Sequence, residues 1–337
     1  MLRSIIARLG LAVISVVVTL AAAEVALRLL TVSPGDYRSL VLPDARFGHR
    51  LRPNAELTVS GVGGVYTTRF RTDSTGFRSR ERGLGRTVIL LGDSEVFGQG
   101  VDDDATLDAA IEHLIGGRVV NLGLPGIGTL AEEAILSEAG FPLSPTAVIL
   151  FITPGNDLRD NINYGRMQPP RSKQRLALAD RVRAGVQRLV IWAPTLAGFL
   201  PTDQIPQLAE QWYSGPWVDK GLPLMEGAIA RMATNSRQVG VSFTVAVIPA
   251  LPQFEPSHKA AMFAMLPDNI ASSLRADPRR PQRLVESLCA HHGIRYIELL
   301  DEFSRLATEG VILKHPVDGH LNARGTAEIA RIVASAL

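Results

Sequence analysis

The sequence predicts a three-layer α/β/α domain built around a parallel sheet of five strands. From residue 87 onward, short apolar runs alternate with longer segments of helical periodicity, a pattern typical of βαβ units. The apolar runs consist almost wholly of Val, Ile and Leu, as expected for strands that are buried on both faces of a sheet. The sequence contains no internal repeat, which argues against a solenoid or a propeller.

The expected strands and helices follow one another along the chain. The strand candidates are Thr87–Leu91, Arg118–Leu122, Ala147–Thr153, Ser242–Pro249 and Arg295–Leu299. The helical stretches are Leu107–Ile115, Leu130–Ala139, Leu222–Val239, Pro281–His292 and Asn322–Ala336. Two segments, at about 159–220 and 250–280, interrupt this rhythm, and we expect them to be insertions in the sheet domain.

Residues 1–30 have the pattern of a membrane-directed helix. Arg3 and Arg8 precede a run without charge from Leu9 to Ala23. A cleaved signal peptide has the same basic start and small-residue exit. We favour an uncleaved signal anchor, a transmembrane helix, because the helical pattern continues to residue 30. Since a basic flank stays in the cytoplasm, either alternative predicts a periplasmic domain at a bacterial inner membrane.

Two segments lie between this helix and the sheet domain. Residues 31–45 contain Pro, Gly and Asp and are expected to be a linker, and residues 46–86 show the short alternating runs of a small β extension. Within the first insertion, a basic amphipathic helix is expected at Arg171–Arg188, and three tryptophans follow it: Trp192, Trp212 and Trp217. A helix at the domain edge is the favoured interpretation, and a lid or membrane-facing flap is the alternative.

Composition excludes several classes of function. The net charge is +2 and no nucleic-acid-binding motif is present, so no nucleic-acid partner is expected. Cys289 is the single cysteine and lies on an apolar helical face, which indicates a small buried side chain. The sequence lacks the phosphate-binding glycine loop that a flavin or nucleotide site would require, so no cofactor is expected. Asp102–Asp104 precedes a helix and is expected to cap it.

Four segments at strand or loop ends carry the groups that acyl transfer through a serine requires. Ser94 follows the first strand in a Gly-Asp-Ser sequence, at the sheet edge where open α/β folds bind ligands. The glycine-rich turn at 121–129 can present a backbone N–H, and Asn156 can donate from its amide. His320 can act as a base with Asp318 to orient it. Each segment alone is ordinary turn chemistry; together they supply a nucleophile, oxyanion donors and a base.

The histidines also raise the question of a metal. His315, Asp318 and His320 include suitable ligand types, but a single loop rarely builds a whole site, so no metal site is expected. His291 and His292 end a helix, where a cation complements the helix dipole. Three other histidines suggest only structural roles: His49, His113 and His258.

In the order and place of these four segments, the chain resembles the SGNH (GDSL-type) hydrolase superfamily. The resemblance covers about residues 87–337 and implies a flavodoxin-like sheet. It also implies a catalytic triad and an oxyanion hole. The triad would be Ser94, His320 and Asp318, and the oxyanion hole the backbone amides of Ser94 and Gly126 with the side chain of Asn156. Gly126 is the best match within its segment, and Gly123 is the alternative.

The chain departs from the family pattern in two places. Glu95 follows the serine where the family often has an apolar residue, and we expect it to change the rim of the site but not the chemistry. The final segment is Asp-Gly-His rather than Asp-x-x-His, which leaves open whether Asp318 or a backbone carbonyl orients His320. The shorter spacing is similar to a membrane-tethered bacterial branch, which also shares the stretches Arg52–Asn54 and Asp73–Arg78. That branch includes relatives linked to O-acetylation of envelope polysaccharides such as alginate.

The resemblance implies a serine esterase that cleaves an O-acyl ester, foremost an O-acetyl ester, of a carbohydrate or a lipid outside the cytoplasm. One alternative is an O-acetyltransferase that modifies an exported polysaccharide. Another is a non-catalytic glycan-binding or assembly protein. The combination of Ser, Gly, Asn and His argues against the last, because a binding module does not require all four.

Overall fold

The computed structural model describes residues 2–30, 37–61, 65–78, 87–164, 182, 186, 207–213 and 215–337. A parallel sheet of five strands lies at the centre, in the order β6-β5-β7-β8-β9. The strands are β5 (Thr87–Leu91), β6 (Arg118–Asn121), β7 (Ala147–Ile152), β8 (Ser242–Val247) and β9 (Arg295–Ile297). Each begins at the expected residue. The strand order reverses between β5 and β7, and ligands bind at the carboxyl ends of strands at such a switch point.

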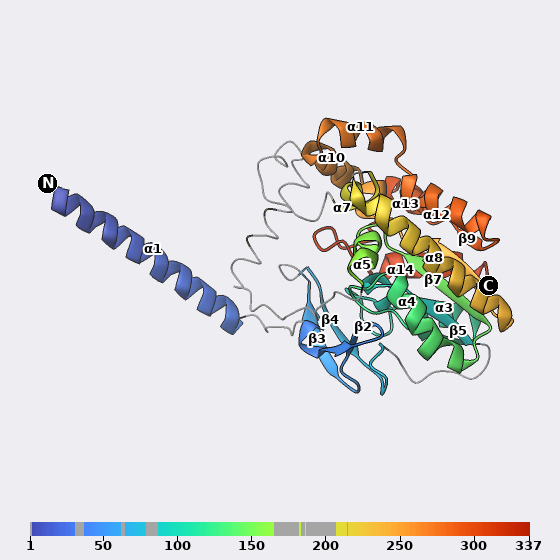
Figure 1. The fold of residues 1–337 in the computed structure, drawn as a ribbon. Coiled ribbons are helices and arrows are strands. Elements are labelled where there is room, and N and C mark those ends of the chain that lie inside the picture. The colour runs from blue at the N-terminus through green and yellow to red at the C-terminus, as the bar shows by residue number, and fades with distance from the viewer. Residues whose placement is uncertain are drawn as a thin grey trace.

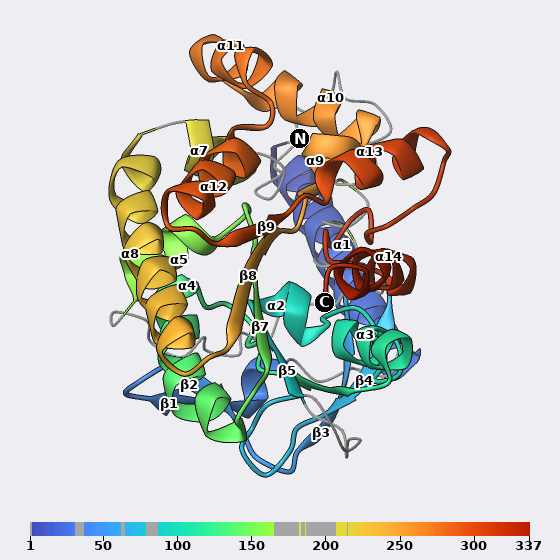
Figure 2. The ribbon, with the colours of Figure 1, turned by 90° about the vertical axis from the view of Figure 1, so that its right-hand side faces the viewer.

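Helices cover both faces of the sheet (Figure 2). Alternate side chains of β5 point to opposite faces, so Val88 and Leu90 pack in one apolar cluster and Ile89 and Leu91 in the other. One face is covered by α3 (Leu107–Ile115), α13 (Leu300–Thr308) and α14 (Ala323–Ala334), and the other by α4 (Thr129–Ile135), α8 (Pro216–Gln238) and α12 (Arg280–His291). Cys289 is buried in the second cluster, as expected.

Four expected helices have different bounds in the structure, and the helix expected at Pro281–His292 is shifted by only one residue. The helix expected at Leu130–Ala139 is α4 followed by a π-helical turn at Leu136–Gly140 and a 3-10 turn at Phe141–Leu143. Helix α8 begins six residues earlier than expected, at Pro216, because proline fits the first helical position, where no N–H is needed. Helix α14 begins after Asn322, whose side chain accepts from the Gly325 N–H as an N-cap.

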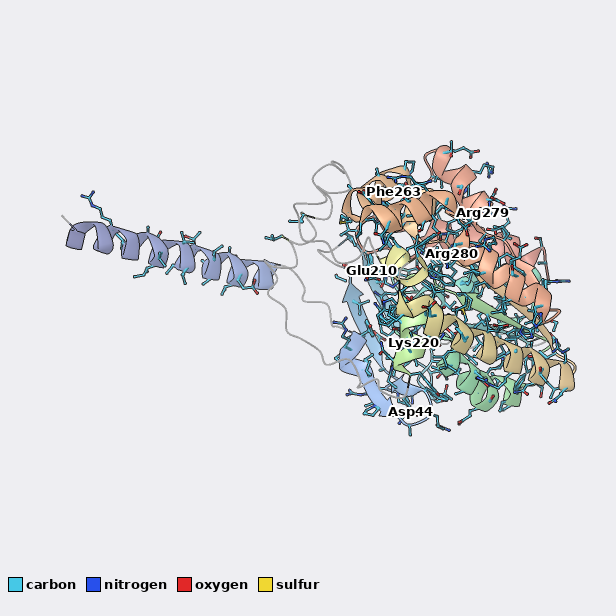
Figure 3. The ribbon with its side chains drawn as sticks, turned by 45° about the horizontal axis from the view of Figure 1, so that its top comes forward. Asp44, Glu210, Lys220, Phe263, Arg279 and Arg280 are labelled. Carbon is cyan, nitrogen blue, oxygen red and sulfur yellow. The ribbon has the colours of Figure 1, made fainter. Side chains whose placement is uncertain are left out.

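The remaining described helices lie at the turn after β5 and in or beside the two insertions. They are α2 (Ser94–Phe97), α5 (Asp157–Asn163), α7 (Gln207–Tyr213), α9 (Leu251–Phe254), α10 (Pro256–Met265) and α11 (Asp268–Ala276). Nearly all of the amphipathic helix expected at Arg171–Arg188, and Trp192 with it, lies outside the described residues. The charged side chains of Lys220 and Arg279 are exposed on the outer helical layers (Figure 3).

Two antiparallel hairpins form the β extension. In the first, β1 (Val41–Asp44) pairs with β2 (Gly48–Leu51), and in the second, β3 (Glu56–Ser60) pairs with β4 (Thr67–Arg71). A 3-10 turn at Tyr37–Leu40 precedes them. The extension therefore begins inside the segment expected to be a linker. Pro43 is tolerated in β1 because that strand is paired on one side only.

Helix α1 (Leu2–Leu30) extends away from the sheet domain (Figure 1). The expected helix is thus present as one continuous element. Its large apolar side chains are 51–70% exposed between Leu11 and Val25. Within the described part of the chain, no helix has both the length and the apolar character needed to cross a membrane.

Candidate active site

Ser94 lies where β5 ends and α2 begins. Asp93 is the N-cap of α2, and its carboxylate accepts from the Glu95 N–H at 2.9 Å. The same carboxylate oxygen accepts from the Thr153 hydroxyl at 3.0 Å, which joins the end of β5 to the end of β7. Asp93 is therefore a buried cap that fixes the turn presenting Ser94 at the switch point of the sheet.

The structure brings His320 and Asp318 to Ser94. The Nε2 atom of His320 lies 2.9 Å from the Ser94 hydroxyl oxygen, and its Nδ1 contacts the Asp318 carboxylate. An N–H on Nδ1 that donates to Asp318 leaves Nε2 free to accept the serine proton. A carboxylate rather than a carbonyl thus orients the imidazole. The short Asp-Gly-His spacing is possible because Gly319 adopts a left-handed backbone conformation, with φ of 91°.

The charges around His320 favour its protonated form. Burial lowers the pKa of the imidazole, but the carboxylates of Asp318, Glu95 and Asp93 together outweigh burial and raise the pKa to about 9. Burial raises the pKa of Asp318, yet the adjacent imidazole outweighs this and holds that pKa below its usual value. At neutral pH the pair is an ion pair, and the imidazole becomes a base as the pH rises toward 9.

Asp318→Asn is expected to lower the pKa of His320 from about 9 to 6.5 or below, because burial then acts without the main opposing charge. A titration of the His320 ring signals by NMR measures this change. Asp301→Asn, which neutralises an exposed carboxylate, is the control and should leave the titration unchanged. A His320 pKa that stays near 9 in Asp318→Asn would contradict this assignment of the charges.

Asn156 begins α5 beside Ser94. Its amide nitrogen donates to the Asp160 carboxylate at 2.9 Å, and the side chain also hydrogen-bonds the buried Asp93 carboxylate, so the amide is oriented beside the serine turn. The carboxylate of Asp157 accepts from the Thr153 N–H at 2.8 Å and closes the turn. Asn156, Asp160 and Ser94 line one cavity of about 440 Å³.

The structure also distinguishes the two candidate glycines. The Gly123 N–H donates to the side chain of Asn121 at 2.9 Å, within a buried turn. Gly126 lines the cavity with Ser94 and has a φ of 76°, a conformation that favours glycine. The carbonyl of the preceding Pro125 accepts from His49 Nε2 at 2.9 Å. Gly126 is therefore the one placed to offer its amide to a ligand.

Helix α7 of the first insertion holds the turn before Asn156 through hydrogen bonds to its backbone. Trp212 in α7 is fully buried, and its indole N–H donates to the Pro154 carbonyl at 2.8 Å. The neighbouring Gln211 donates to the Gly155 carbonyl and accepts from the Arg159 N–H at 3.1 Å. Trp212 follows the segment that was expected to be an edge helix or a flap, and it belongs to the core. Nothing local in the sequence indicates this role, because its partner lies 58 residues away.

The β extension supports the nucleophile turn. Arg78, at the end of the shared Asp73–Arg78 stretch, is 3% exposed. Its guanidinium donates to three carbonyls after α2, those of Phe97, Gly98 and Val101. It also pairs with Asp103 at 2.9 Å. Sequence reasoning noted the stretch but gave Arg78 no role.

The acidic run Asp102–Asp104 does not cap α3, contrary to the sequence prediction. Thr106 is the N-cap residue of that helix. Asp102 instead accepts from the Arg69 N–H at 3.0 Å, and Asp103 pairs with Arg71 as well as Arg78. These two carboxylates therefore bind the backbone and side chains of β4 instead of the N–H groups at the start of α3.

Arg78→Met should lower the free energy of unfolding by about 3–5 kcal/mol, because it leaves buried carbonyls without a donor and Asp103 without its buried partner. Urea denaturation measures the loss. Arg71→Met is the matched control: it removes an exposed cation from the same Asp103 and should cost about 0–1 kcal/mol. An equal decrease in the free energy of unfolding in both variants would show that the buried contacts of Arg78 do not stabilise the fold more than an exposed ion pair does.

The loop that carries His320 is held on three sides. His315 Nε2 contacts the Gly100 carbonyl at 2.9 Å, and His258 Nε2 contacts the Pro316 carbonyl at 2.7 Å. The ring of Tyr66 from the β extension lies 4.7 Å from the ring of His315. His315 is thus engaged with the backbone rather than with a metal, and His258 fixes the loop beside the cavity.

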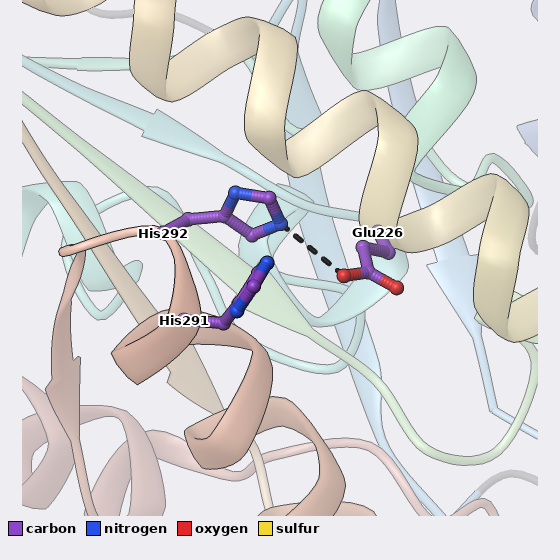
Figure 4. A group of neighbouring side chains, drawn as sticks. All are labelled: Glu226, His291 and His292. Atoms are coloured by element: carbon purple, nitrogen blue, oxygen red, sulfur yellow. Dashed lines mark hydrogen bonds and ion pairs between the residues drawn. The ribbon is translucent and has the colours of Figure 1, made fainter.

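A group with metal-ligand geometry lies elsewhere in the described structure. Glu226 of α8 meets His291 and His292 at the end of α12, with ligand atoms within 4.8 Å of one another (Figure 4). His292 Nε2 lies 3.2 Å from the Glu226 carboxylate. Because α12 ends just before β9 begins, this group is at the amino ends of the strands, opposite to Ser94. It has no part in the site around Ser94.

No protein-family model matches the sequence, and no curated protein matches it. The fold is similar to solved structures of low sequence identity. A putative lipolytic protein of the G-D-S-L family from Desulfitobacterium hafniense is 13% identical, covers 75% of this chain and 100% of its own, and has a TM-score of 0.42. An acetyl xylan esterase, AlAXEase, is 11% identical, with coverages of 74% and 99% and a TM-score of 0.43.

A lipase/acylhydrolase from Enterococcus faecalis is 13% identical, with coverages of 75% and 95% and a TM-score of 0.40. GDSL-type hydrolases, which the motifs resemble, are thus among the structures to which this fold is similar. At these scores the likeness carries no argument about the chemistry of this chain, which rests on the residues of the site.

Proposed function

We propose that the protein is a serine esterase of the SGNH type that hydrolyses short O-acyl esters, foremost O-acetyl esters, of a polar alcohol. The observation that carries the proposal is the contact of His320 with Ser94 on one side and Asp318 on the other. Gly126 and Asn156 line the same cavity, where an oxyanion would form. Nucleophile, base, orienting acid and oxyanion donors are therefore in one place.

The geometry supports a two-step mechanism. The Ser94 hydroxyl attacks the ester carbonyl as His320 Nε2 takes its proton. The amides of Ser94 and Gly126, with the side chain of Asn156, stabilise the oxyanion. As the tetrahedral intermediate collapses, His320 protonates the departing alcohol and an acyl group remains on Ser94. Water, activated by His320, then attacks the acyl group and releases the acid and free Ser94.

The lining of the cavity favours a small acyl group. Polar and charged side chains outnumber apolar ones around its volume of about 440 Å³. The apolar side chains come from three separate segments of the chain: Leu208; Ile248, Ala250, Leu251 and Pro252; and Pro316 and Val317. A long acyl chain would require a continuous apolar groove, whereas this lining suits an acetyl group on a carbohydrate.

Ser94→Ala should reduce the hydrolysis of p-nitrophenyl acetate to the background rate, because the nucleophile is lost. Asn156→Ala should lower kcat about 10²–10³-fold, the cost of one oxyanion donor. Ser273→Ala, which removes an exposed hydroxyl on α11, is the control and should retain full activity. Hydrolysis by Ser94→Ala at the wild-type rate would refute the proposed mechanism.

Transfer of the acyl group to a sugar is the second candidate, because the polar lining admits a carbohydrate hydroxyl in place of water. The same assay with an added oligosaccharide separates the two functions. Hydrolysis predicts equal amounts of acetate and p-nitrophenol, with or without the sugar. Acetylated sugar in excess of acetate would favour the transferase, and a folded wild-type protein without turnover would favour a binding protein.

We further propose that α1 is an uncleaved anchor in a bacterial inner membrane, with the sheet domain outside the cytoplasm. The basic start of the sequence and the exposed apolar side chains from Leu11 to Val25 support this. The full chain, expressed in bacteria, should stay with the membranes after a high-salt wash, and protease should reach the domain in spheroplasts. A chain beginning at Tyr37 is the control. Release of the full chain into the soluble fraction would contradict the anchor.

A further inference from the structure

We propose that Glu95, paired with Lys314, is a positioning residue that fixes both the place and the basicity of His320. The inference rests on the proposed function, in which His320 is the base. Glu95 directly follows Ser94 in α2 and is 6% exposed. It was expected to change the rim of the site. Instead, the structure buries it in the wall of the cavity, between the Ser94 turn and the loop that carries His320.

One carboxylate joins two segments that lie more than 200 residues apart in the sequence. Its Oε1 accepts from the Lys314 ammonium at 2.5 Å, and its Oε2 accepts from the Leu321 N–H at 2.9 Å. Lys314 and Leu321 pair with each other as an antiparallel bridge. The segment between them contains both Asp318 and His320. Glu95 therefore connects both ends of the His320 loop to the turn that carries Ser94.

An apolar residue at position 95 cannot replace these contacts. It would leave the ammonium of Lys314, which is 2% exposed, without a counter-charge, and the Leu321 N–H without an acceptor. Buried polar groups in that state are costly, so the chain would repack around them. Repacking would move the His320 loop, and a shift of about 1 Å can cost on the order of a hundredfold in rate.

Glu95 also acts on His320 through its charge. The charged groups that face the imidazole are the carboxylates of Asp318, Asp93 and Glu95, and each favours the protonated ring. Lys314 pairs with Glu95 and lines the same cavity as His320. The other titratable groups at this place, His315 and Tyr66, adjoin Asp318. Neutralising Glu95 therefore lowers the pKa of His320, whereas neutralising Lys314 does not.

The test compares Glu95→Gln with Lys314→Met. Both variants break the buried pair and should be less stable in urea denaturation. Only Glu95→Gln should lower the pKa of His320, read from its NMR titration, and shift the acidic limb of kcat/KM for p-nitrophenyl acetate to lower pH. We expect a loss in kcat of about 10- to 100-fold in Glu95→Gln with KM within about twofold of the wild type. Glu286→Gln, which neutralises an exposed carboxylate on α12, is the control and should leave every measurement unchanged.

A double variant covers the case in which Glu95→Gln does not fold. Glu95→Leu with Lys314→Met removes both charges of the buried pair and should fold, because apolar replacement of a whole buried pair is tolerated. It should still show the lower pKa of His320 and the lower kcat. An unchanged pKa and kcat in a folded variant would overturn the role of Glu95. Loss of the proposed function itself is recognised separately, by a wild type that is no faster than Ser94→Ala.

Discussion

The hydrogen bond between His320 Nε2 and the Ser94 hydroxyl joins residues that are 226 positions apart, and much of the structure keeps that bond in place. The first strand of the sheet delivers Ser94, and the loop before the last helix delivers His320. Neither end is held by the sheet alone. The Asp93 cap fixes the serine turn, and the carboxylate of Glu95 fastens the loop of the imidazole to it. Because the Ser94 turn and the His320 loop come from distant parts of the chain, polar contacts at the carboxyl ends of the strands are needed to hold them together.

Those contacts place charge where water is excluded, and the fold tolerates Arg78 and Glu95 there because each has a close partner of opposite charge. Arg78 donates to carbonyls and to Asp103, and Glu95 meets Lys314. Such pairs seldom add much stability in comparison with apolar packing, but breaking one member is costly. They therefore act mainly as constraints on position. The small β extension contributes in the same way, because its Arg78 and His49 side chains contact backbone carbonyls beside the turns of Ser94 and Gly126.

The sequence was sufficient to predict the sheet, because doubly buried strands leave a continuous apolar signal and their ends limit the possible sites. It was also sufficient to bring Ser94, Asn156 and His320 to one edge. It could not reveal the residues that hold them. Trp212 and His258 bond to backbone carbonyls, which leave no trace in the sequence of their partners. Glu95 was expected at the rim because its partner Lys314 is distant along the chain, and only the fold shows that the two share a buried space.

The most direct test of this account is covalent labelling of the folded wild-type protein with a fluorophosphonate, followed by peptide mass spectrometry. A serine that His320 activates beside oxyanion donors should react, whereas ordinary serine hydroxyls should not. The account predicts one adduct, on Ser94, formed faster as the pH rises toward 9 and His320 loses its proton. A folded protein that acquires no adduct, or acquires it on another serine, would contradict the account.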